Sequence, residues 1–136
     1  NALNTPIHTL PTIAVLDSGL DLDVATREDL IALQPVFGNA ALIDDLSHGT
    51  GIAILLAAPS NGVGMRGLGP HNPVLPIRLA NRAEFLAGKV PFARLKDAFK
   101  IARYHKTKII NLSASDIEIN WPKLEMDALL KEYGEM

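Results

Sequence analysis

The chain has 136 residues, of which 48% are hydrophobic, so it is long enough for one domain with a buried core. Its net charge of −2, and the absence of any basic cluster larger than Lys106, Thr107 and Lys108, give no indication of nucleic-acid binding. The absence of cysteine excludes disulfides and thiolate chemistry. No apolar run approaches the roughly 20 residues that span a membrane, so we expect no membrane partner.

Four short apolar segments predict β-strands: residues 13–16, 35–43, 74–79 and 108–112. The second consists of residues 35–38 and 41–43 and is interrupted at Gly38 and Asn39. The first is a continuous apolar run, which is typical of a strand covered on both faces. Pro76 in the third indicates an edge or a bulge, because proline cannot donate a hydrogen bond to a neighbouring strand.

Helical patterns lie between these strands. An apolar run over residues 52–58 predicts a buried helix with His48 on its first turn. Residues 91–103 predict an amphipathic helix with apolar side chains at helical spacing and basic side chains on the other face. Pro122 opens a last helix, whereas residues 26–29 fit a helix cap and a loop equally well. The alternation predicts an α/β fold with a mainly parallel sheet.

Two polar motifs stand beside these elements. Asp17 follows the first strand and is itself followed by Ser18 and Gly19, and His48 begins a helix. Alone, the first motif is more often a turn, and a lone histidine is more often structural. Together, an acid after a strand and a histidine at a helix start are how α/β folds bring a carboxylate to an imidazole. Ser47 and Thr50 are suited to capping the start of that helix.

The same motifs resemble those of the subtilisin-like serine proteases (subtilases), as do residues 61–64 and 109–113. The resemblance covers residues 13–113. It implies the N-terminal part of a serine endopeptidase domain, with a doubly wound, mainly parallel sheet truncated after about four strands in the order 2-3-1-4.

In that family the triad runs Asp, His, Ser, so the resemblance makes Asp17 and His48 the catalytic acid and base. It also implies that Gly49 lets the backbone pass close to the substrate. The substrate is a polypeptide, and Asn111, Leu112 and Ser113 would bind it as an added strand.

The third triad member is missing from the sequence. No serine stands in the family's Gly-Thr-Ser motif, and no oxyanion-stabilising asparagine motif follows. Losing one such oxyanion donor already costs about 10²–10³ in turnover, so we expect the chain alone to be inactive. Gly51, Ile54 and Ser115 also depart from the family pattern. A catalytically degenerate module that binds peptides or a partner protein, and an unrelated α/β domain with chance motifs, therefore stay open.

A glycine-rich loop spans residues 59–70. Its G-x-G-x-x-G pattern follows a helix and leads to a strand, the reverse of a dinucleotide-binding loop. The resemblance instead implies structural calcium, with an oxygen of Asn61, backbone carbonyls of the loop and the carboxylate of Asp29 as ligands. A metal-free turn fits the same residues.

The expected truncation of the sheet leads to a prediction about binding partners. Without a fifth strand, the segment from Lys108 to Leu112 would be an exposed apolar edge. We expect it to pair with the missing C-terminal part of the domain or with a second copy of the chain. The resemblance implies secretion, because members of that family are usually secreted, and the sequence itself does not indicate a cellular compartment.

Overall fold

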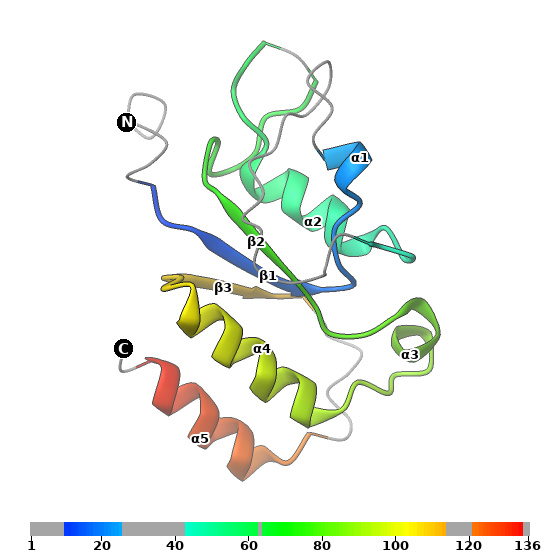
Figure 1. The fold of residues 1–136 in the computed structure, drawn as a ribbon, viewed down its shortest axis with the longest axis vertical. Coiled ribbons are helices and arrows are strands. Elements are labelled where there is room, and N and C mark those ends of the chain that lie inside the picture. The colour runs from blue at the N-terminus through cyan, green and yellow to red at the C-terminus, as the bar shows by residue number, and fades with distance from the viewer. Residues whose placement is uncertain (1–9, 26–42, 63, 114–120, 135–136) are drawn as a thin grey trace.

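The computed structural model describes residues 10–25, 43–62, 64–113 and 121–134. In chain order the elements are β1 (Ile13–Asp17), α1 (Leu22–Ala25), α2 (His48–Ala57), β2 (Val74–Arg78), α3 (Arg82–Leu86), α4 (Phe92–Tyr104), β3 (Ile109–Leu112) and α5 (Lys123–Gly134). Figure 1 shows α2 on one side of the sheet and α4 with α5 on the other. The predicted α/β fold is confirmed.

The sheet of the described residues has three parallel strands in the order β2-β1-β3. Every residue of the central strand β1 is buried, as its continuous apolar run predicts. Pro76 lies opposite Val15 in an unbroken register, so β2 has no bulge there, and β2 is one of the two edge strands of this sheet. The strand predicted at residues 35–43 lies outside the described residues, apart from Ile43, which is not in a strand.

Alternate side chains of β1 enter two separate cores. Ile13 and Val15 pack with α2 on one face of the sheet. Ala14 and Leu16 pack on the other face with α4 and α5. Because successive side chains of a strand point to opposite faces, Asp17 falls on the face of α2, at the carboxyl end of the strand.

The helix α4 has the amphipathic character that its sequence predicts. Its buried residues are Leu95, Ala98, Phe99 and Ala102. The basic side chains of its other face, Arg94, Lys96, Lys100 and Arg103, are exposed. In the parts of the chain that the structure describes, no helix is long and apolar enough to cross a membrane.

Candidate functional site

The carboxyl end of β1 and the first turn of α2 meet at a glycine. A Cβ atom on Gly49 would lie 2.3 Å from the carbonyl oxygen of Gly19 and 3.1 Å from the Cβ atom of Asp17. No real side chain fits such distances, so glycine allows α2 to lie directly on the turn that follows β1. The close approach of Gly49 that the structure shows is to the chain's own backbone, and the approach to a substrate that the resemblance implies stays a prediction.

This contact brings together the two residues singled out from the sequence. The Nδ1 atom of His48 lies 2.8 Å from Oδ1 of Asp17, although the residues are 31 positions apart. The backbone N–H of Ser18 donates to the same oxygen, also at 2.8 Å. Since Oδ1 is the acceptor in both bonds, the ring proton of neutral His48 belongs on Nδ1, and Nε2 keeps its lone pair.

The two side chains differ sharply in exposure. That of Asp17 is 1% exposed and that of His48 is 49% exposed. The other carboxylate oxygen of Asp17, Oδ2, is buried and has no hydrogen-bond partner within the described residues. An enclosed carboxylate behind a solvent-facing imidazole can hold that ring in one tautomer and stabilise it when it takes up a proton.

A second carboxylate, that of Asp44, lies behind the pair. Its Oδ1 accepts hydrogen bonds from the Ser18 hydroxyl at 2.7 Å and from the backbone N–H groups of Leu46 at 3.1 Å and Ser47 at 2.8 Å. Its Oδ2 accepts from Thr50, at 2.9 Å from the backbone nitrogen and 2.6 Å from the hydroxyl. Burial alone would raise the pKa of Asp44, but the hydrogen bonds from Thr50 and Ser18 outweigh burial and hold that pKa below its ordinary value of 3.8.

The prediction that Ser47 caps α2 is wrong. Ser47 occupies the N-cap position in a left-handed conformation, with φ of 64°, and its side chain makes no capping hydrogen bond. The side chain of Asp44 binds the Thr50 N–H instead, in the manner of a capping residue. An aspartate just upstream of a helix start is the one signal in the sequence that could have indicated this role.

The predicted substrate-binding residues lie at the same end of the sheet. Asn111 and Leu112 are opposite Val15 and Leu16, so Ser113 follows β3 beside the end of β1. The Asn111 side chain donates to the Ser113 hydroxyl at 2.8 Å. Leu112 packs on the α4 side of the sheet, away from the face that carries Asp17. Substrate binding by these residues stays a prediction.

Of the two side chains predicted to bind calcium, the structure describes only one. Asp29 lies outside the described residues, and Asn61 lies in the exposed loop after α2. The described parts of the chain hold no group of three or more His, Cys, Asp or Glu side chains that could bind a metal ion. Calcium stays a prediction.

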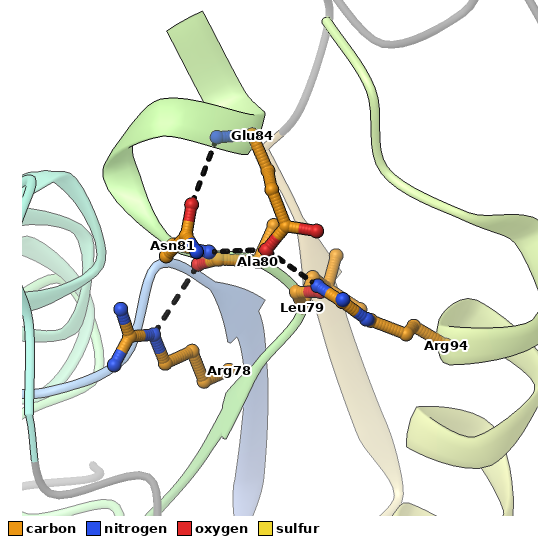
Figure 2. A pocket seen from close by; sticks show the side chains of 6 residues that line it. All are labelled: Arg78, Leu79, Ala80, Asn81, Glu84 and Arg94. Atoms are coloured by element: carbon orange, nitrogen blue, oxygen red, sulfur yellow. Dashed lines mark hydrogen bonds and ion pairs between the residues drawn. The ribbon is translucent and has the colours of Figure 1, made fainter. Parts of the chain in front are cut away.

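A hollow that the sequence did not indicate opens at the carboxyl end of β2 (Figure 2). It has a volume of about 330 Å³ and is lined by Arg78, Leu79, Ala80, Asn81, Glu84 and Arg94. One of these lining residues, Leu79, donates its backbone N–H to the carbonyl oxygen of Asp17 at 2.8 Å.

Each charged residue that lines this hollow is part of an ion pair. Arg94 lies 2.7 Å from Glu84, and this hydrogen bond holds the pKa of Glu84 below its ordinary value of 4.5. Arg94 also donates to the Leu79 carbonyl oxygen at 3.2 Å. Arg78 pairs with Asp45 at 3.0 Å. Both guanidinium groups that line the hollow therefore already have a carboxylate partner.

No protein-family model matches the chain, and a search of curated proteins found no match.

Proposed function

We propose that the chain supplies the acid and the base of an Asp-His-Ser triad, as the N-terminal part of a subtilisin-like serine endopeptidase domain. The observation that carries the proposal is the 2.8 Å contact between a buried Asp17 carboxylate and Nδ1 of a half-exposed His48. The order β2-β1-β3 supports it, because it equals the corresponding part of the doubly wound sheet that the motif resemblance implies.

In the proposed reaction, His48 is the general base. Its Nε2 lone pair removes the proton from a serine hydroxyl, and the ring later returns that proton to the leaving amine. Asp17 holds the tautomer and stabilises the imidazolium that forms in between. An extended substrate along the Asn111 to Ser113 edge would lie at the same end of the sheet as this pair.

The nucleophile has to come from elsewhere. Within the described residues, no serine hydroxyl is hydrogen-bonded to His48. The hydroxyl of Ser18, the nearest serine to Asp17 in sequence, donates to Asp44 and accepts from the Gly49 N–H at 2.9 Å. That of Ser113 accepts from Asn111. We therefore infer that the triad serine belongs to the remainder of the domain.

A catalytically degenerate module that binds a peptide or a partner protein is the second candidate. It is favoured by Gly51, which stands where the family usually has a second histidine. A Cβ atom on Gly51 would meet no heavy atom within 4 Å, so there is open space at this position of α2. The hollow lined by Arg78 and Arg94 offers such a module a recess for one polar side chain of a ligand.

The two candidates are separated by labelling the native gene product with a fluorophosphonate and reading its intact mass. For a protease we expect a labelled protein heavier than the 14.7 kDa of this chain. His48→Ala should abolish labelling, because the serine is then not activated, and His105→Ala, a histidine at the end of α4, should leave it intact. A native product that takes no label would refute the protease and favour the binding module.

A further inference from the structure

Asp44 lies four residues before His48 and contacts both segments that form the Asp17–His48 pair. We propose that Asp44 is a positioning residue: its carboxylate fixes the geometry of the pair by joining the turn after β1 to the first turn of α2. The role concerns the pair itself, and only its bearing on catalysis rests on the proposed function.

The first link runs through Ser18. The Ser18 backbone N–H donates to Asp17 Oδ1, and its hydroxyl donates to Asp44 Oδ1. The same hydroxyl accepts the Gly49 N–H at 2.9 Å. One serine therefore connects the buried carboxylate, the second carboxylate and the start of α2, so that a displacement of Asp44 displaces the oxygen that His48 contacts.

The second link holds the backbone on both sides of His48. Asp44 accepts from the N–H of Ser47 just before the histidine and from the N–H of Thr50 two residues after it. The Thr50 hydroxyl donates to Asp44 as well and accepts the Asp21 N–H at 2.8 Å. Because Ser47 is in a left-handed conformation without a side-chain cap, Asp44 supplies the restraint that a capping side chain normally gives.

The arrangement requires a carboxylate. Five donors converge on the two oxygens of Asp44. An ionised carboxylate offers about four lone pairs, so two of these donors share one of them. An asparagine has a single accepting oxygen, and its NH₂ group would oppose either the donors at Oδ1 or those of Thr50. The negative charge also lies at the helix N-terminus, where the backbone dipoles favour it.

The ring nitrogens of His48 provide the test. In the ¹⁵N-labelled 136-residue chain, long-range ¹H–¹⁵N correlation should show His48 with the proton on Nδ1. In Asp44→Asn we expect the Nδ1 proton signal to be lost, and the two ring nitrogens to move toward the averaged positions of a mixed tautomer. His71 and His105 serve as internal references.

Asp45→Asn is the matched control. It removes one negative charge from the neighbouring position, and it breaks the ion pair with Arg78 without touching the contacts of Asp44. We expect its His48 spectrum to equal that of the wild type. If Asp44→Asn lowers the midpoint of urea unfolding but leaves the His48 ring signals unchanged, Asp44 is merely structural and the proposal is overturned.

Two milder variants cover the case in which Asp44→Asn does not fold. Ser18→Ala and Thr50→Val each remove one hydroxyl link and leave the other oxygen of Asp44 occupied. Each should shift the His48 ring signals part of the way toward the mixed tautomer, and wild-type signals in both would overturn the proposal. Failure of fluorophosphonate labelling would refute the protease and leave these spectra unaffected, so the two proposals fail separately.

Discussion

Replacing Gly49 with alanine tests the contact that places His48 beside Asp17. The added Cβ atom would lie 2.3 Å from the carbonyl oxygen of Gly19 and 3.0 Å from its nitrogen. Both are backbone atoms and cannot turn aside, so either α2 or the turn after β1 has to move. Gly51→Ala is the control on the same helix, because its Cβ atom meets nothing within 4 Å.

The expected change in the free energy of unfolding follows from three contributions. Overpacking a close contact costs about 1–3 kcal/mol. Displacing α2 also weakens the hydrogen bond from the Gly49 N–H to the Ser18 hydroxyl, a net loss of about 1 kcal/mol. Alanine recovers up to about 1 kcal/mol of helix propensity. The net loss for Gly49→Ala is therefore about 1–3 kcal/mol, whereas Gly51→Ala should gain up to about 1 kcal/mol.

Urea unfolding followed by far-ultraviolet circular dichroism measures both variants. With a denaturant slope of about 1–3 kcal/mol/M, Gly49→Ala should lower the midpoint by about 1 M and Gly51→Ala should raise it slightly. The Nδ1 proton signal of His48 should disappear only in Gly49→Ala. Equal shifts of the two urea midpoints in the same direction would refute the reasoning, since the close contact at Gly49 would then have no effect of its own on stability.

Two further predictions concern acid and association. Because the folded-state pKa of Asp44 lies below 3.8, its carboxylate stabilises the fold above that pH, and this contribution is lost as the pH falls through the folded-state pKa. Below pH 3.8 the unfolding free energy of the wild type should therefore fall more steeply than that of Asp44→Asn; parallel profiles in urea titrations would contradict this. Separately, β3 is the other edge strand of the described sheet and its Ile109 is 43% exposed, so the chain should self-associate in sedimentation and Ile109→Lys should weaken the association. A wild type that stays monomeric at high concentration would count against edge pairing.

The elements that the sequence predicted well are those whose signal is local. The apolar run of β1 and the helical spacing of Leu95 and Phe99 in α4 depend only on neighbouring residues, and both are found as expected. The contact between Asp17 and His48 could also be predicted, because the sequence places Asp17 at the end of a strand and His48 at the start of a helix.

The contacts that escaped prediction join residues far apart in the chain. Asp44 and Ser18 are 26 positions apart, and neither sequence context indicates a hydrogen bond between them. The hollow at β2 forms only when α3 and α4 bring Glu84 and Arg94 to the strand. The left-handed conformation of Ser47, whose N–H donates to Asp44, also escaped prediction, since nothing in its residue type demands that conformation.

The alternation of side chains along β1 restricts how this protein can change in length. Inserting or deleting one residue within Ile13–Asp17 would turn Asp17 from the α2 face to the apolar core of α4 and α5. A carboxylate there would be buried without a donor and far from His48. Evolution can therefore substitute residues in β1 more freely than it can add or remove them.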